Sequence, residues 1–244
     1  VMRPLNSMKN IEFTRIQCNS VGQMDFEDFK RAIRANTKAV IMSHASNVSG
    51  TILDLEKVGQ ICRNKGIYFI IDSSQTAGFL DMDFQALKAD AIGFTGHKGL
   101  LGPQGIGGFL INDNLAKNTS SLIDGGTGSL SDEEVQPEYM PDKYEAGTPN
   151  IPGIYGLHRA LKYLLAYGIK NIREEEISLL KVFLEGINNM DRRKVKIIGL
   201  EETIARTPVL SLDFPKYDNG LIGHELSKNY GIMTRTGMHC APSA

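Results

Sequence analysis

The sequence predicts an α/β protein with a three-layer, mostly parallel or mixed sheet and a smaller α+β domain towards the C-terminus. In the first half of the chain, short apolar runs alternate with helical patterns, which is typical of strands covered by helices on both faces. In the second half, two long helical patterns precede further short apolar runs. We expect residues 1–160 to form part of the large domain and residues 161–244 part of the small one.

The elements of the first half follow from their patterns. Strands are predicted at residues 11–18, 38–42, 67–71, 91–95 and 105–111. The run at 67–71 is almost continuously apolar, as in a strand buried within a parallel sheet. Helices are predicted at 25–34, where Asp25 is the N-cap, and at 55–64, where Gly66 is the C′ residue.

The second half begins after residues 125–145, a stretch rich in glycine and acidic residues that lacks periodicity and predicts a loop. Pro152 and Gly153 then open a helical pattern. A longer helix near 172–187, strands near 195–198 and 209–214, a helix near 221–229 and a strand near 232–235 complete the predicted α+β unit.

The composition argues against several classes of protein. The 244 residues are 41% hydrophobic and 23% charged, which is an ordinary globular balance. The net charge of -1 gives no reason to expect binding to nucleic acid or to an acidic membrane. No apolar run reaches the roughly 18 residues that span a bilayer, and no secretory signal is visible. We therefore expect neither a membrane nor a nucleic acid as partner.

The cysteines are three in number and widely spaced: Cys18, Cys62 and Cys240. This pattern favours a reducing, cytoplasmic compartment over a disulfide framework. Neither CxxC nor HExxH occurs, so we expect no metal site. The chain opens with Val1 and ends soon after a dense motif, so we expect both ends to be cut.

Two predicted strands end beside residues that could carry chemistry. Asp72 follows the strand at 67–71, and Lys98 follows the strand at 91–95. Ligands bind at the carboxyl ends of strands in open α/β sheets. Taken singly, Asp72 is as readily a helix N-cap, and Lys98 a solvated loop lysine. Together they form the pair that pyridoxal-phosphate (PLP) enzymes need, a lysine for the Schiff base and an aspartate for the pyridine nitrogen.

Five motifs occur in order along almost the whole chain. Residues 43–50 read Ser-His-Ala-Ser-Asn-Val-Ser-Gly, 71–75 Ile-Asp-Ser-Ser-Gln, 95–98 Thr-Gly-His-Lys, 144–150 Tyr-Glu-Ala-Gly-Thr-Pro-Asn and 235–242 Arg-Thr-Gly-Met-His-Cys-Ala-Pro. The set resembles the cysteine desulfurase and selenocysteine lyase branch of the class V aminotransferases, which are fold type I PLP-dependent enzymes. The resemblance implies a fold of the PLP-dependent transferase type.

The resemblance also implies cofactor-binding roles for residues of the first motifs. Lys98 matches the lysine that forms the Schiff base with PLP, and Asp72 matches the carboxylate that keeps the pyridine nitrogen protonated. Gln75 matches the side chain that hydrogen-bonds the phenolic oxygen of the cofactor. Thr95 and His97 match ligands of its phosphate, and His97 is also counted among the catalytic residues with Lys98.

Further residues take roles in the same way. Asn47 matches a residue near the phenolic oxygen and the substrate carboxylate, and Arg235 is expected to help bind substrate. Thr148 matches a residue that reaches the phosphate of the neighbouring subunit, which implies a homodimer with shared sites. Cys240 matches the nucleophilic cysteine, and the nearby Arg235 and His239 favour its thiolate.

The activity implied is removal of sulfur from L-cysteine, which leaves alanine and a persulfide on Cys240 that passes to a sulfur-acceptor protein. Cys18 and Cys62 have no comparable neighbours and are expected to be structural, as is His44. Another class V enzyme stays open, namely a selenocysteine lyase, an aminotransferase or a β-lyase, and so does an inactive fragment. The family's ring-stacking histidine and carboxylate-binding arginine have no counterpart in this chain.

Overall fold

The computed structural model describes residues 1–130 and 132–241. The chain forms two compact units. One, here called the sheet unit, comprises Lys38–Met42 and Leu55–Gly168. The other, the terminal unit, comprises Val1–Thr37, Ser43–Asp54 and Ile169–Ala244. The predicted division into residues 1–160 and 161–244 stays a prediction for the whole protein.

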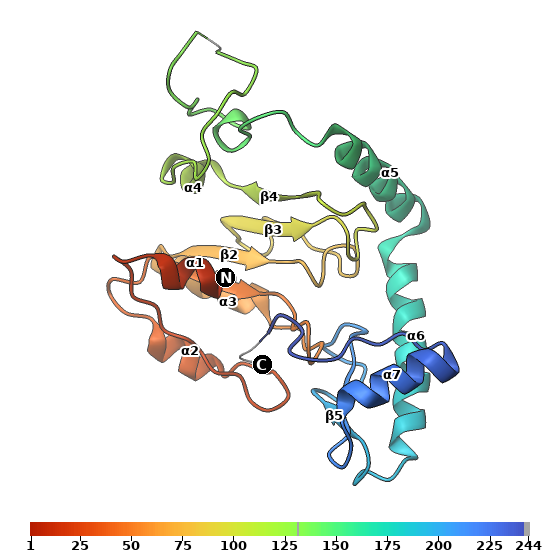
Figure 1. Cartoon of the computed structure of the whole chain (residues 1–244). Coiled ribbons are helices and arrows are strands. Elements are labelled where there is room, and N and C mark those ends of the chain that lie inside the picture. Colours follow the sequence, from red (N-terminus) through yellow and green to blue (C-terminus); the bar gives the residue numbers. More distant parts are fainter. Residues whose placement is uncertain (131, 242–244) are drawn as a thin grey trace. The chain divides into compact units, whose positions relative to one another are not determined.

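The sheet unit is built on four strands in the order β1-β2-β3-β4, of which β2, β3 and β4 are labelled in Figure 1. They are β1 (Ala39–Ser43), β2 (Tyr68–Asp72), β3 (Ala91–Thr95) and β4 (Gly107–Ile111). β2 and β3 are parallel, whereas β3 and β4 are antiparallel. The predicted α/β class with a mixed sheet is therefore confirmed.

Helix α3 (Leu55–Lys65) joins β1 to β2 and packs through its apolar face. Val58 and Cys62 on this face are fully buried. Gly59 brings the helix against the sheet unit's core, because a Cβ there would lie 3.3 Å from the Phe69 ring and 2.1 Å from the carbonyl oxygen of Leu87. The helix ends before Gly66, which has a φ of +65° as its predicted C′ role requires.

The rest of the sheet unit contains α4 (Asp113–Lys117), the 3-10 turn η1 (Asp142–Tyr144) and α5 (Ile151–Tyr167). Among the described residues of the predicted loop at 125–145, η1 is the one helical turn, and residue 131 lies outside the described residues. The predicted helix after Pro152 corresponds to α5, whose N-cap Asn150 accepts a hydrogen bond from the backbone N–H of Gly153.

The terminal unit contains α1 (Met2–Ser7), α2 (Phe26–Ala32), α6 (Ile169–Asn188), β5 (Lys196–Ile198), β6 (Ser211–Asp213) and α7 (Asn219–Tyr230). β5 and β6 pair antiparallel. Buried apolar side chains of α6 and of the β5 segment form one cluster: Leu180, Leu184, Ile187, Val195 and Ile197. The predicted N-cap Asp25 accepts hydrogen bonds from the first N–H groups of α2.

Two predicted strands are wrong within the part of the chain that is described. Residues 11–18 form no strand, and Cys18 makes only an isolated bridge with Met24. Residues 232–235 leave α7 after the left-handed Gly231 and pair with no strand. Alternating apolar residues favour a strand, but a strand also needs a partner for its backbone groups. Across the described residues, no helix has the length and apolar character that crossing a membrane would need.

Candidate functional site

Asp72 and Lys98 lie at one edge of the mixed sheet. β2 ends at Asp72, and the register places Asp72 opposite Gly93 of the parallel strand β3. β3 ends two residues later, at Thr95, and Lys98 follows. The half-buried Asp72 carboxylate accepts a hydrogen bond of 2.9 Å from the backbone N–H of Ser74. The carboxylate therefore helps to shape the turn after β2, as an N-cap would, at the strand edge where ligands bind.

The segment around Lys98 is a tight turn that leaves the lysine exposed. The backbone N–H of Leu101 donates to the carbonyl of Lys98 at 2.8 Å, and Gly102 donates to Gly96 at 2.7 Å. Thr95 Oγ1 and His97 Nδ1 lie 2.8 Å apart. A hydroxyl, an imidazole and an ammonium group thus come from four consecutive residues.

The turn after Gln75 lies directly against the Lys98 loop. A Cβ on Gly78 would lie 2.1 Å from the carbonyl oxygen of Gly99, so only a glycine permits this approach. Gly78 also has a φ of +87°, which disfavours any other residue. Ser73 adds a second link, because its hydroxyl donates to the carbonyl of Gly93 at 2.9 Å. The backbone contact therefore holds Gln75 and Lys98 on adjoining loops.

The donor set of this edge suits PLP. A lysine amine is required for the covalent link, and a carboxylate for the ring nitrogen. Hydroxyl and imidazole groups can donate hydrogen bonds to a phosphate. Among the described residues, no ion pair engages the Lys98 ammonium. The residues present thus fit the cofactor that the sequence predicts.

Thr148 lies on an exposed segment that the structure ties to the glycine-rich loop after Lys98. Asn150 donates through its side-chain amide to the carbonyl of Gly105 at 3.2 Å. This hydrogen bond fixes the segment to the loop that precedes β4. The predicted contact of Thr148 with a neighbouring subunit stays a prediction.

The other predicted site residues lie in the terminal unit, where the structure brings Asn47 to the cysteine motif. The Asn47 side-chain amide donates to the carbonyl of His239 at 2.6 Å, across 192 positions of sequence. Arg235 donates from its guanidinium to Cys240 Sγ at 3.2 Å. The structure therefore places a cationic side chain beside the sulfur.

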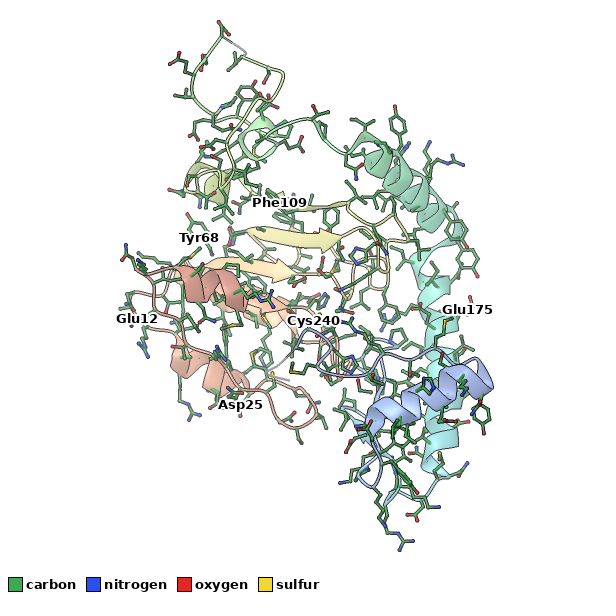
Figure 2. The ribbon with its side chains drawn as sticks, in the orientation of Figure 1. Glu12, Asp25, Tyr68, Phe109, Glu175 and Cys240 are labelled. Carbon is green, nitrogen blue, oxygen red and sulfur yellow. The ribbon has the colours of Figure 1, made fainter. Side chains whose placement is uncertain are left out.

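Cys240 sits on a strained and exposed turn, and its position is labelled in Figure 2. His239 and Cys240 have φ values of +50° and +61°, and Ala241 donates its backbone N–H to the carbonyl of Met238 at 2.8 Å. Two consecutive non-glycine residues in the left-handed region are sparsely populated and are typical of functional sites. Pro242, the last residue of the motif, lies outside the described residues.

The other two cysteines differ from Cys240. Cys62 is buried on α3, and burial raises the pKa of its thiol to about 11, so it is chemically quiet as predicted. Cys18 is exposed, so it is not a core residue, although partial desolvation raises the pKa of its thiol. His44 is buried as expected of a structural residue, and burial lowers its pKa to about 4.

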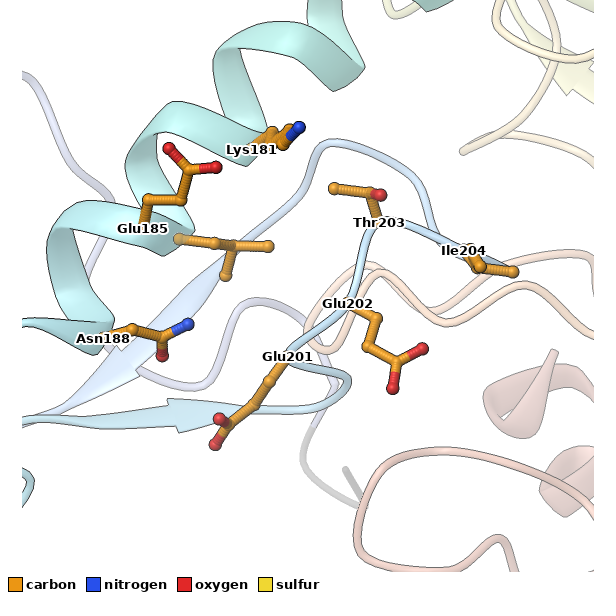
Figure 3. A pocket seen from close by; sticks show the side chains of 8 residues that line it. Lys181, Glu185, Asn188, Glu201, Glu202, Thr203 and Ile204 are labelled. Carbon is orange, nitrogen blue, oxygen red and sulfur yellow. The ribbon is translucent and has the colours of Figure 1, made fainter.

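A pocket in the terminal unit contains none of the predicted site residues. It lies between α6 and residues 201–204, and Figure 3 shows Glu185 facing the segment that carries Glu201 and Glu202. Its carboxylates do not gather into a metal site, because the described residues contain no cluster of potential ligands.

Two residues that the sequence reasoning missed hold predicted site residues in place, one in each unit. Gly78 permits the approach of the two loops in the sheet unit. Arg206 is 1% exposed and anchors a segment that touches the loop of Asn47. Neither belongs to a motif, and both look ordinary in the sequence. A glycine just past a strand-end motif was the one available signal.

The mixed sheet, with a lysine and an aspartate at neighbouring strand ends, defines an α/β protein of the type that binds PLP. The chain matches the aminotransferase class-V family over residues 2–244 and belongs to that family. Its members are PLP-dependent enzymes.

Relatives of the chain carry the name cysteine desulfurase. A probable cysteine desulfurase of Pyrococcus abyssi is 32% identical over 240 residues, which cover 97% of this chain and 58% of the relative. The apo structure of the cysteine desulfurase from Thermococcus onnurineus matches with a TM-score of 0.83 and 31% identity, covering 93% of this chain and 56% of that one. The cysteine desulfurase CsdA from Escherichia coli matches with a TM-score of 0.78 and 27% identity, over 89% and 53% of the two chains. The chain thus spans little more than half the length of these relatives.

Proposed function

We propose that the whole protein is a PLP-dependent cysteine desulfurase that converts L-cysteine into alanine and a persulfide on Cys240. The observation that carries the proposal is the geometry of Cys240, an exposed sulfur on a strained turn with the Arg235 guanidinium 3.2 Å away. An inert structural thiol needs neither feature. The names of the relatives support the same reading.

When bound, PLP supplies an electron sink for the charge that develops at the substrate Cα. In the proposal, Lys98 holds the cofactor covalently and then moves the Cα proton. Asp72 would pair with the ring nitrogen and keep it protonated. Gln75 would hydrogen-bond the phenolic oxygen, and the resemblance in sequence gives Asn47 a role towards that oxygen and the substrate carboxylate.

The phosphate is bound by Thr95 and His97 in this proposal, with Thr148 of a partner subunit, which requires a homodimer. The exposure of Thr148 is compatible with that role. A mass measurement in solution tests the dimer directly. We also propose a cytoplasmic location, which the free cysteines favour. From the order of the predicted elements, we propose that the domains of the whole protein divide near residue 160.

Sulfur transfer follows as a displacement at sulfur. The Cys240 thiolate attacks the substrate sulfur, the new S–S bond forms, and the Cβ–S bond breaks with its electron pair going to the carbon side. Protonation of that carbon completes alanine, so that cysteine and a thiol give alanine and a persulfide without an external oxidant. Arg235 holds the thiolate before attack, and an acceptor thiol later removes the outer sulfur.

The test uses Cys240→Ser and Lys98→Ala variants of the full-length protein, with Cys18→Ser as the matched control because Cys18 is the other exposed thiol. We expect Cys240→Ser to form no persulfide and to release alanine at less than about a hundredth of the wild-type rate. Lys98→Ala should lose the absorbance of the covalently held cofactor, while Cys18→Ser should behave as wild type. Alanine release by Cys240→Ser at the wild-type rate would refute the role of Cys240. Assays with selenocysteine beside cysteine decide which atom the enzyme removes.

A further inference from the structure

Arg206 is a fully buried cation in the terminal unit whose charge is met by backbone carbonyls. It is 1% exposed. Its Nη2 donates to the carbonyl of Val209 at 2.5 Å, its Nη1 donates to the carbonyl of Leu200, and its Nε donates to Thr207 at 3.3 Å. Burial lowers the pKa of this guanidinium. In the described part of the chain, no carboxylate forms an ion pair with it.

Burying an arginine destabilises the fold unless its N–H donors are hydrogen-bonded. Here the backbone carbonyls that accept those hydrogen bonds all belong to one segment. The bonds to residues 200, 207 and 209 gather that segment around the guanidinium. Methionine or leucine would fill the same volume without the desolvation cost, so packing alone does not account for an arginine here. The fixed fork of donors instead sets the backbone of residues 200–209 in one shape.

The shaped segment clamps the loop of residues 46–51. The backbone N–H of Thr207 donates to the carbonyl of Gly50 at 2.8 Å, and Thr51 pairs with Arg206 as an isolated bridge. A Cβ on Gly50 would lie 2.6 Å from the carbonyl oxygen of Val209, the same oxygen that Arg206 holds. Ser211 adds a hydrogen bond of 2.7 Å from its hydroxyl to the carbonyl of Val48.

The clamped loop carries Asn47, whose amide donates to the carbonyl of His239, directly before Cys240. Contacts therefore run without a break from the guanidinium, through the carbonyl of Val209 and Gly50, to the turn that presents the sulfur. We propose that Arg206 is a positioning residue that fixes the loop of residues 46–51 and, through Asn47, the turn that carries Cys240. The part of this inference that concerns catalysis rests on the proposed function.

The test measures hydrogen exchange of backbone amides in the full-length protein and in its Arg206→Lys variant. Lysine keeps the charge but cannot donate to three carbonyls in the same fixed fork. We expect exchange in residues 46–51 and 236–241 to rise about tenfold or more, because at least one charged hydrogen bond is lost. Exchange in α6, whose buried face belongs to the same unit, should stay unchanged.

A second variant, in the loop of residues 46–51, tests the same contact between this loop and the carbonyl of Val209. Gly50→Ala places a Cβ against the carbonyl that Arg206 holds, so it should give the same local pattern of faster exchange if Arg206→Lys fails to fold. Arg193→Lys is the matched control, because Arg193 is exposed and, among the described residues, forms its ion pair with Asp191 at the surface. This control variant should leave the exchange of residues 46–51 and 236–241 unchanged.

The single-turnover rate of persulfide formation on Cys240 distinguishes a positioning role of Arg206 from a purely structural one, because a residue that only stabilises the fold would not change this rate. In Arg206→Lys we expect this rate to fall about tenfold while α6 keeps its exchange protection. Faster exchange throughout α6, or unchanged exchange in residues 236–241, would overturn the inference. A wild-type protein that forms no persulfide would instead refute the proposed function, and the exchange result would still stand.

Discussion

Replacing Gly78 by alanine tests whether backbone contact between two loops builds the candidate cofactor site. Gly78 has a φ of +87°, and an L-residue there costs about 1–2 kcal/mol. Its Cβ would also lie 2.1 Å from the carbonyl oxygen and 2.3 Å from the carbonyl carbon of Gly99. Both atoms are backbone, so relief requires a shift of the Lys98 loop, at about 1–3 kcal/mol. The expected loss in the free energy of unfolding is therefore about 2–5 kcal/mol.

Gly66→Ala is the matched control for this loss. Gly66 also has a positive φ, +65°, but no atom lies within 4 Å of the Cβ that alanine would add. It should lose only the backbone part, about 1–2 kcal/mol. Urea unfolding of the full-length, cofactor-loaded variants measures both values. Equal losses at the two positions would refute the reasoning, as would a Gly78→Ala variant that binds PLP as tightly as the wild type.

Two further predictions concern buried titratable groups. Burial lowers the pKa of His44 from 6.5 to about 4, so its side chain is neutral in the folded protein at neutral pH. The unfolded chain therefore binds a proton at this residue more readily than the folded protein does. The free energy of unfolding should be constant above pH 6.5 and should decline by up to about 3 kcal/mol as the pH falls to 4. Urea titrations at several pH values should show a shallower decline in His44→Gln than in the wild type, and equal slopes would contradict this. Cys62, with a pKa of about 11, should escape labelling by a maleimide at neutral pH while Cys18 and Cys240 react, and should react fully in urea. Peptide mass spectrometry reads the three sites separately, and rapid native labelling of Cys62 would show that it is not held in the core.

The elements that the sequence predicts well are those whose signals are local. The strand at 91–95 has the same bounds as β3, because an apolar run lies between an acidic residue and a glycine. Helix α3 follows from the 3.6-residue spacing of its buried face. The short α4 was not predicted because five residues give no periodicity to detect, and its Asn112 cap alone is a weak signal.

The two wrongly predicted strands show that a local sequence pattern does not specify the segment with which a strand would pair. Residues 11–18 alternate apolar and polar side chains, yet Ile11 and Phe13 remain exposed. Residues 232–235 begin with two apolar side chains, Ile232 and Met233, and all four residues are exposed. Alternation predicts which side chains would share a face, but pairing depends on a second segment that the pattern does not specify. The bounds of such elements therefore depend on tertiary contacts.

The candidate site divides in the same way. Lys98 and Asp72 were predicted from the strand ends beside which they lie, and Cys240 from the motif that resembles the family's; the register of β2 and β3 confirms that the strand ending at Asp72 and the strand preceding Lys98 are neighbours. Gly78 and Arg206 act through position, and position exists only after folding. A glycine becomes essential when another backbone approaches it, and an arginine becomes a scaffold when carbonyls surround it. Residues that react can therefore be predicted from ordered motifs, whereas residues that hold them in place are recognised only from their contacts. Variants of the second kind should alter the order of a loop before they alter its chemistry.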